Sequence, residues 1–284
     1  MTALHNEGYA ISELCHAAGI SRQAYYQYRK RSVPHTEAEN DIVASTIAEI
    51  YVETDGIYGY RQMCYAVNKT LETAYNRKRI YRLMTRMGLK SVTRIKRQHY
   101  IPHTPQQVAE NVLNREFHAD HVNEKWLTDV TEFKALNGEK AYLSAIIDLY
   151  DNSIVTYKFG RSNNNQLVFD TFTSAIQKHP QATPLVHSDR GFQYTSYGFK
   201  KILDAQQIQQ SMSRVGRCID NGPIEAFWGK IKSERFHIKR KQKYYNDYQS
   251  IIEDITRYID FYNHRRPQHK FKGLSPLEFR ALAA

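Results

Sequence analysis

Three acidic residues of this 284-residue chain fall where elements of regular structure are expected to begin or end. Asp129 lies in a run rich in β-branched and aromatic residues, 125–133, that predicts a strand, and Asp189 ends a second short apolar strand. Glu225 opens a predicted helix, and 35 residues separate it from Asp189. Any one of these acids alone would be an ordinary surface carboxylate. Together they can converge on a pair of hard divalent cations, which favour carboxylate oxygens and clamp the attacking and leaving oxygens of a phosphodiester.

The sequence around these acids alternates between strand and helix patterns. Two turn signals, Asn-Gly at 137–138 and Asp-Asn at 151–152, separate the first three strands. Strands are expected at about 125–133, 140–149 and 152–160, followed by a helix at 165–178, a strand at 184–188, a helix at 195–206 and a short strand at 207–212. By itself this pattern supports a mixed α/β sheet.

Four ordered sequence motifs carry a resemblance that covers nearly the whole chain. They are Trp-Leu-Thr-Asp-Val-Thr (126–131), His-Ser-Asp-Arg-Gly-Phe-Gln-Tyr (187–194), the segment 211–225 ending in Asn-Gly-Pro-Ile-Glu, and Tyr-Asn-His-Arg-Arg-Pro (262–267) followed by Gly-Leu-Ser-Pro (273–276). The chain resembles the DDE transposases of bacterial insertion sequences, in particular the second open-reading-frame product (OrfB type) of the frameshifting insertion-sequence family numbered three, which is related to retroviral integrases. Departures are small: Val122 stands where proline is usual, Gly222 where alanine is common and Ala226 where serine is common. None of them removes a carboxylate.

The resemblance implies a ribonuclease-H-like integrase core, a mixed five-stranded sheet with helices, preceded by helical helix-turn-helix-like DNA-binding segments. It places Asp129 on the first strand beside Asp189 at the end of the fourth, and makes both, with Glu225, catalytic ligands of two Mg²⁺ (or Mn²⁺) ions. The implied activity is cleavage of a DNA strand at the ends of the element, followed by strand transfer in which the exposed 3′-hydroxyl attacks target DNA as the nucleophile. A homo-oligomer on DNA and fusion to an upstream product are also implied. The alternative is a DNA-binding regulator, or an incomplete subunit that needs that upstream product for catalysis.

The charge of the chain favours a polyanionic partner. Lys and Arg exceed Asp and Glu by 11 and the pI is near 9.4, although ribosome-bound and membrane-surface proteins share this profile. Residues 121–213 carry 9 Lys and Arg against 9 Asp and Glu, whereas residues 1–120 carry 16 against 12 and residues 214–284 carry 15 against 8. A neutral middle with basic flanks is what a nuclease core held on DNA by basic arms would show. The sequence has no phosphate-cradling glycine-rich loop that would suggest nucleotide hydrolysis.

The cysteines and the hydropathy of the sequence indicate in which cellular compartment the protein is expected. Cys15, Cys64 and Cys218 stand far apart and lack Cys-x-x-Cys spacing, which argues against disulfides and a zinc knuckle. The sequence shows no apolar run of membrane-spanning length and no secretion signal in its first residues. We therefore expect a bacterial cytoplasmic protein without a membrane partner, associated with the nucleoid when it is bound to DNA.

Residues 1–33 are predicted to form a helix-turn-helix-like segment. An apolar helix face at 11–18 precedes a turn, Ser21 is the expected N-cap of the next helix, and Arg22 lies near the exposed side of that helix. A small helical pair that merely packs is an equal alternative.

Residues 36–90 are predicted to form a second helical DNA-binding module. Its first helix spaces Ile42, Ile47 and Ile50 as a buried face. Its basic residues are candidates to grip phosphates, which gives affinity without base information, or else form a solvated face. The candidates are Arg61, Arg77, Lys78 and Arg82. Residues 91–121, with Arg94, Lys96 and Arg97, are predicted to be a basic linker.

Residues 122–238 are the predicted catalytic core, and residues 239–284 are its C-terminal helical extension. Lys232 follows Glu225 by seven residues, which puts the two on one helix face about 10 Å apart along the axis. Its ammonium group is a candidate DNA contact, with a solvated surface lysine as the alternative.

The loops around the acids offer further candidates. Arg190 and Gln193 follow the second acid and either contact DNA or fix the loop. Asp220 is expected to shape the turn before the helix of the third acid and to cap that helix. Trp228 is expected to pack this helix on the sheet, in preference to stacking on bases. The motif at 262–267 either docks the C-terminal helix on the core, which we favour, or contacts DNA.

Overall fold

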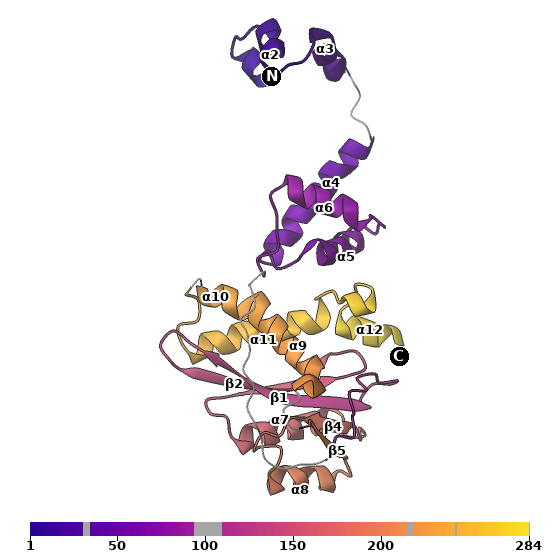
Figure 1. Cartoon of the computed structure of the whole chain (residues 1–284), viewed down its shortest axis with the longest axis vertical. Helices are drawn as coiled ribbons and strands as arrows, with labels where there is room; N and C mark the ends of the chain where they lie inside the picture. Colours follow the sequence, from indigo (N-terminus) through magenta and orange to yellow (C-terminus); the bar gives the residue numbers. More distant parts are fainter. Residues whose placement is uncertain (31–34, 94–109, 215–217, 242, 284) are drawn as a thin grey trace. The chain divides into compact units, whose positions relative to one another are not determined.

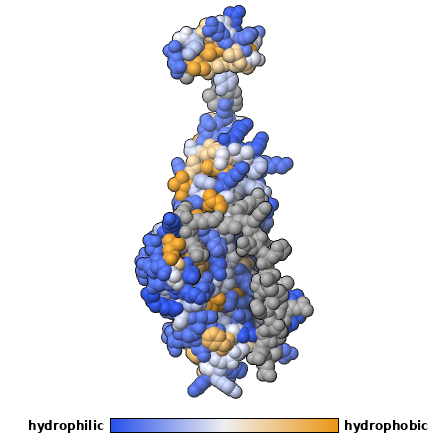
Figure 2. Space-filling view, turned by 60° about the vertical axis from the view of Figure 1, so that its left-hand side comes forward, coloured by the Kyte–Doolittle hydropathy of each residue, from blue (hydrophilic) through white to orange (hydrophobic). Residues whose placement is uncertain are grey.

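The computed structural model describes residues 1–30, 35–93, 110–214, 218–241 and 243–283. The predicted linker residues Arg94, Lys96 and Arg97 lie outside these ranges. The chain divides into two compact units, residues 1–49 and residues 50–284. In the part of the chain that is described, no helix is both long enough and apolar enough to cross a bilayer. The face shown in Figure 2 is largely hydrophilic, with small separate hydrophobic patches.

The first unit consists of helices. They are α1 (Thr2–Asn6), α2 (Ile11–Ala17), α3 (Arg22–Lys30) and most of α4 (His35–Glu53). Helices α2 and α3 pack together, with Cys15 and Tyr25 as their buried residues. Ser21 caps α3 as predicted, because its hydroxyl oxygen accepts a hydrogen bond from the backbone N–H of Ala24 at 3.1 Å.

The second unit begins with a helical pair, α5 (Tyr60–Thr70) and α6 (Arg77–Arg86). Their apolar faces pack together and bury Met63, Cys64, Val67, Ile80, Leu83 and Met84. Asn68 fixes the turn between them, since its side chain accepts from Tyr75 N at 2.8 Å and donates to Tyr75 O at 3.0 Å. Asn76 caps α6 by accepting from Arg79 N at 2.9 Å. The polar side chains of α6 are thereby left on one exposed surface.

A mixed five-stranded sheet forms the centre of the unit (Figure 1). Its strands are β1 (Lys125–Lys134), β2 (Lys140–Asp148), β3 (Ile154–Gly160), β4 (Leu185–Ser188) and β5 (Gln210–Met212), in the spatial order β3-β2-β1-β4-β5. The first three strands are antiparallel, whereas β4 runs parallel to β1 and β5 parallel to β4. Parallel neighbours need a crossover, which a helix supplies in each case. The predicted mixed five-stranded sheet is confirmed, and its first and fourth strands are neighbours as the resemblance implied.

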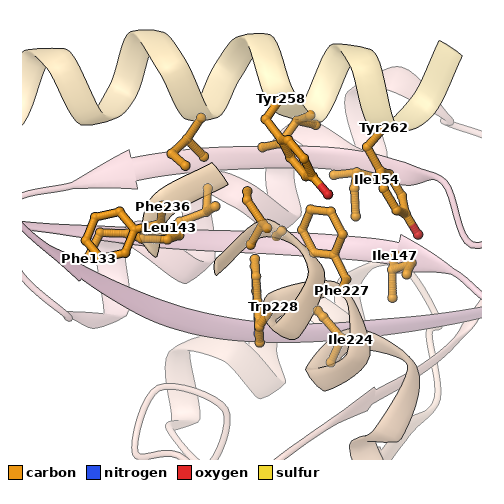
Figure 3. Close-up of a cluster of buried hydrophobic side chains, with 14 of the residues drawn as sticks. Phe133, Leu143, Ile147, Ile154, Ile224, Phe227, Trp228, Phe236, Tyr258 and Tyr262 are labelled. Atoms are coloured by element: carbon orange, nitrogen blue, oxygen red, sulfur yellow. The ribbon is translucent and has the colours of Figure 1, made fainter. Parts of the chain in front are cut away.

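Helices cover both faces of the sheet, because successive side chains of a strand point to opposite faces. Trp126 packs in one core with α7 (Asn165–Lys178) and α8 (Tyr197–Ala205). Leu127 packs in the other core with α9 (Gly222–Ile231) and α11 (Tyr248–His264). Figure 3 shows this second core, in which Phe227 of α9 lies next to the tyrosines of α11 and Trp228 lies over the strands.

Helix α9 continues through a π-helical turn, η2 (Lys232–Phe236), into α10 (His237–Lys241). Glu234 in this turn is buried and forms a bidentate ion pair with Arg266, while the Tyr258 hydroxyl donates to it at 2.8 Å. The extra residue of a π turn resets the rotation of the helix, so that Phe236 also reaches the sheet and packs on Phe133, with 4.9 Å between ring centroids.

The motif at 262–267 packs on the core, as we favoured. The Tyr262 hydroxyl donates to Asn152 O at 3.2 Å, and the Asn263 side chain bonds both backbone groups of Ile154. The remaining elements are the 3₁₀ turns η1 (Cys218–Asn221) and η3 (His269–Phe271) and the helix α12 (Pro276–Ala283).

Candidate active site

The sheet register brings the two predicted aspartates together. Thr128 of β1 pairs with Ser188 of β4 in parallel register. Asp129 is the next residue along β1 and Asp189 the first residue after β4, so their backbones lie about one strand spacing, roughly 5 Å, apart. Asp129 shares a strand face with Leu127, which is the face that α9 covers.

Glu225 lies in the first turn of α9, with its side chain exposed. Its pKa is raised by partial burial and then by the negative charge of Asp189. Burial also raises the pKa of Asp129, to about 7, and the charges of Asp189 and Glu225 add to that rise. The pKa of Asp189 is raised by burial. The structure therefore brings the three predicted acids within electrostatic range of one another.

Protein donors orient both aspartates. Asp129 Oδ1 accepts from Val130 N at 2.8 Å, and its Oδ2 accepts from the Trp228 indole Nε1 at 2.9 Å. Asp189 Oδ1 accepts from Gly191 N at 2.8 Å. Both carboxylates are thus held in defined orientations where the pairing of β1 with β4 ends.

The chemistry of this set fits a hard divalent cation. Carboxylate oxygens are the ligands that Mg²⁺ and Mn²⁺ prefer, and a bound cation favours the ionised carboxylates that burial and mutual repulsion here disfavour. Within the described residues, however, no three His, Cys, Asp or Glu side chains are already arranged to hold a metal ion. Asp129, Asp189 and Glu225 therefore match Mg²⁺ in donor type and location, and the exposed Glu225 side chain must turn toward the aspartates to complete a site.

The other predicted residues of the core lie as follows. Lys232 begins the π turn and is half-buried, with its ammonium nitrogen 5.7 Å from the centre of the Phe133 ring. Burial lowers its pKa, while the charges of Asp129 and Glu132 act in the opposite direction. Of the three acids, Asp129 is thus the one whose charge acts on Lys232.

Arg190 and Gln193 serve the loop after β4. The Arg190 guanidinium donates to Ser213 O at 2.6 Å. Gln193 is only 3% exposed and donates to Asn163 Oδ1. These bonds support the alternative in which the two residues fix the loop, and the burial of Gln193 leaves its side chain little surface for DNA.

A further set of predicted residues surrounds a groove of about 790 Å³ beside α6. It is lined by Tyr60, Arg61, Asn76, Arg77, Lys78, Tyr81 and Arg82. Tyr60 and Tyr81 were not among the residues predicted from the sequence; their rings meet edge to face with 5.4 Å between centroids. Each directly precedes a predicted arginine, Arg61 or Arg82, and this adjacency was the available signal. Arg22 lies exposed on α3, in the first unit.

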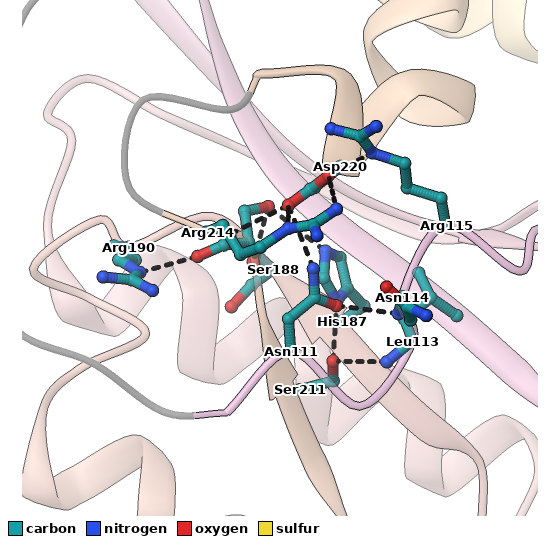
Figure 4. A network of polar contacts seen from close by, with 11 residues as sticks. Asn111, Leu113, Asn114, Arg115, His187, Ser188, Arg190, Ser211, Arg214 and Asp220 are labelled. Atoms are coloured by element: carbon teal, nitrogen blue, oxygen red, sulfur yellow. Dashed lines mark hydrogen bonds and ion pairs between the residues drawn. The ribbon is translucent and has the colours of Figure 1, made fainter.

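The loop before Glu225 is organised by Asp220, which is fully buried (Figure 4). Its carboxylate accepts hydrogen bonds from Arg214 Nε and Nη2, at 2.9 and 3.0 Å, and from Arg115 Nε at 2.7 Å. It also accepts from Arg214 N at 3.0 Å and from the Asn111 side chain at 2.9 Å. The hydrogen bonds from Arg214, followed by those from Arg115, hold the pKa of Asp220 well below its usual range.

Asp220 therefore shapes the turn as predicted, but it does not cap α9. The N-cap position is Asn221, and its side chain makes no capping hydrogen bond. His187 lies next to this network, within hydrogen-bond distance of Ser211 and Ser213. Burial lowers its pKa to about 4, so its imidazole ring is neutral at pH 7.

Comparison with known proteins places this geometry in a family. The sequence matches the integrase core domain over residues 119–218 and again over 206–276, and an HTH-like domain over residues 37–97. It is 39% identical over 274 residues to the putative transposase InsK of insertion sequence element IS150 from Escherichia coli K12, covering 96% of this chain and 94% of that protein. The chain belongs to the IS3 family of insertion-sequence transposases.

A second relative and one solved structure are also similar to this chain. This IS3-family chain is 30% identical over 280 residues to the IS600 31 kDa protein of Shigella sonnei, covering 94% of the chain and 97% of that protein. Among solved structures it is similar to the catalytic core domain of HTLV-2 integrase in complex with magnesium, at 17% identity and a TM-score of 0.44, covering 56% of this chain and 97% of the other. The IS3-family transposases with an integrase core are DDE polynucleotidyl transferases.

Proposed function

We propose that this transposase cuts one DNA strand at each end of its insertion sequence and joins the freed 3′-hydroxyl to target DNA. In the first step a water oxygen bonds to phosphorus and the bond to the 3′-oxygen breaks, which leaves a 3′-hydroxyl. In the second step that hydroxyl attacks a target phosphodiester and displaces its 3′-oxygen. Both steps are in-line displacements at phosphorus, so one site serves both.

The observation that carries the proposal is that Asp129 and Asp189 lie on neighbouring strands where the β1–β4 pairing ends, with Glu225 near enough to influence the pKa of Asp129. Burial, followed by repulsion from the other acids, raises the pKa of Asp129 and of Glu225, as expected of ligands of a divalent cation in the absence of that cation. These three residues would hold Mg²⁺ or Mn²⁺, two ions in the full site. When bound, such ions polarise the nucleophile and stabilise charge on the phosphate oxygens.

Basic residues of the chain would hold the DNA. Lys232, beside the acids, would contact a phosphate near the scissile bond as a point charge. Arg190 is a second candidate in the core. Arg22 in the first unit and the groove residues Arg61, Arg77, Lys78 and Arg82 would bind phosphates away from the reaction and position the element end. Because an element has two ends, we propose that at least two copies act together on DNA.

The test is cleavage of labelled element-end DNA by the purified chain with Mg²⁺ and with EDTA. We expect Mg²⁺-dependent nicking that Glu225→Gln abolishes. The matched control is Glu253→Gln, an exposed glutamate on α11, which should cut like the unchanged chain. Asp129→Asn should bind the DNA with nearly unchanged affinity while cutting nothing.

Two other outcomes would decide against the proposal as stated. Nicking that survives in Glu225→Gln would refute the assignment of the acids. Binding without nicking by the unchanged chain would favour a regulator, or a subunit that lacks its upstream fusion partner. Repeating the assay with the fused protein would separate these two.

A further inference from the structure

The side chain of Trp228 connects two of the three acids. Trp228 follows Glu225 by three residues on α9, close to one helical turn, so the two residues lie on neighbouring positions of that helix. Its indole N–H reaches across to β1 and donates to Asp129 Oδ2 at 2.9 Å. The helix that carries one acid is therefore bonded directly to the carboxylate of another.

The surroundings of Trp228 hold this bond in place. The side chain is 6% exposed and packs in the core between α9 and the sheet, with the ring of Phe227 beside it at a centroid distance of 5.1 Å (Figure 3). A buried indole N–H needs an acceptor, and a close-packed ring has few alternative rotamers. Apolar contacts between α9 and the sheet are non-directional, whereas this hydrogen bond has a direction and a length.

The hydrogen bonds to Asp129 leave room for a cation. A carboxylate offers about four lone-pair sites. Two of these accept from Val130 N and Trp228 Nε1, one on each oxygen. A lone pair remains on each oxygen, so the carboxylate can bind a metal ion while it keeps both donors.

We propose that Trp228 is a positioning residue for the divalent cation, because it fixes the orientation of the Asp129 carboxylate and ties it to the helix that carries Glu225. The inference rests on the proposed function of the three acids as metal ligands. Hydrogen-bond donors behind a ligating carboxylate typically change metal affinity by about 10–100-fold.

The experiment is a Mn²⁺ titration of the full-length chain, followed by the electron paramagnetic resonance signal of the free ion. Trp228→Phe keeps an aromatic ring in the core and removes only the N–H donor. We expect its Mn²⁺ dissociation constant to rise about 10–100-fold. Trp126→Phe is a matched control, since the Trp126 indole is also buried and donates to Asn123 Oδ1 at 3.1 Å, away from the acids. Its Mn²⁺ affinity should stay within about 2-fold of the unchanged chain, which is below the effect of losing a donor behind a ligand.

The outcomes separate the two proposals. If the unchanged chain binds Mn²⁺ and Trp228→Phe binds it equally well, the role of Trp228 is refuted while the metal site stands. If the unchanged chain binds no Mn²⁺ and Asp129→Asn changes nothing, the metal site itself is refuted, and this inference with it.

A second measurement needs no substitution and so covers the case in which Trp228→Phe does not fold. The chain has only two tryptophans, so its ¹H–¹⁵N spectrum contains two indole N–H signals, assigned with Trp126→Phe. Titration with Mg²⁺ should move the Trp228 signal and leave the Trp126 signal in place. Equal movement of both signals, or movement of neither during saturable Mg²⁺ binding, would refute the inference.

Discussion

Replacing Asp220 by asparagine should destabilise the integrase core by about 3 kcal/mol. The carboxylate is fully buried and accepts bonds from Arg115, Arg214 and Asn111. An asparagine of the same shape offers one acceptor oxygen, and its NH₂ group would face the donors that the second oxygen now satisfies. Removing one partner of a buried ion pair costs about 3–5 kcal/mol. The Arg115 and Arg214 side chains are 35% and 43% exposed, so they stay hydrated after the change, and the lower end of that range, about 3 kcal/mol, applies.

Urea unfolding followed by tryptophan fluorescence measures this loss in the right part of the chain, because Trp126 and Trp228 both belong to the core. The control is Asp204→Asn, which removes an exposed pair with Lys200 at 2.8 Å and should cost about 0.3–0.5 kcal/mol. A loss below about 1 kcal/mol for Asp220→Asn, the size of one ordinary hydrogen bond, would refute the reasoning.

The difference in stability between the unchanged chain and Asp220→Asn should also depend on pH. The pKa of Asp220 is well below its usual range in the folded chain, so the folded state favours the ionised form. Its stabilising contribution is then fully present above the unfolded pKa of about 3.9 and is lost as the pH falls toward the folded value. The difference in unfolding free energy between the unchanged chain and Asp220→Asn should be constant from pH 7 to about pH 5 and shrink below about pH 4. A difference that grows on acidification would contradict the assignment.

Three further predictions concern other parts of the second unit. Glu234→Gln should cost about 3–5 kcal/mol in the same urea assay, since Arg266 is almost fully buried and would lose its counter-charge; a change under about 1 kcal/mol would contradict this. Lys232→Ala should lower the cleavage rate of element-end DNA while leaving the urea midpoint nearly unchanged. A variant that cuts as fast as the unchanged chain would refute the proposed phosphate contact of Lys232. Arg77→Ala with Arg82→Ala should weaken binding to element ends and to unrelated DNA alike, and reduce the slope of log affinity against log salt by about 2; a change confined to element ends would instead show base recognition.

The sheet could be predicted because its signals are local. Asn137-Gly138 marks the turn between β1 and β2, and β-branched or aromatic runs mark the strands on either side, so the predicted boundaries lie within a few residues of the observed ones. Helix periodicity was a weaker guide. On α4, Ile47 is buried as predicted, whereas Ile42 is 58% exposed, because spacing along a helix shows which residues share a face but not where the packing partner ends.

The acids of the candidate site could be named from the sequence, but most of what holds them could not. Arg115 lies 105 residues before Asp220, and Trp228 lies 99 residues after Asp129, so no local pattern relates the partners. The π turn at Lys232–Phe236 has no sequence signature either, since it follows from fitting both Trp228 and Phe236 to one sheet. A capping role for Asp220 was a reasonable local expectation, and it failed because two guanidinium groups, from Arg115 far back in the sequence and from Arg214 six residues before, offer the buried carboxylate stronger partners than backbone N–H groups.

The ion pair between Glu234 and Arg266 has a consequence for the order of events in the cell. The helix carrying the third acid is completed at residue 241, but the guanidinium that neutralises its buried glutamate comes from the C-terminal motif. Until Arg266 has been synthesised and has folded onto the core, this buried carboxylate has no counter-ion, so the π turn that follows α9 cannot reach the arrangement seen here. A polypeptide that ends before Arg266 would therefore keep all three acids, yet it would leave a buried charge unpaired in the helix that carries the third one.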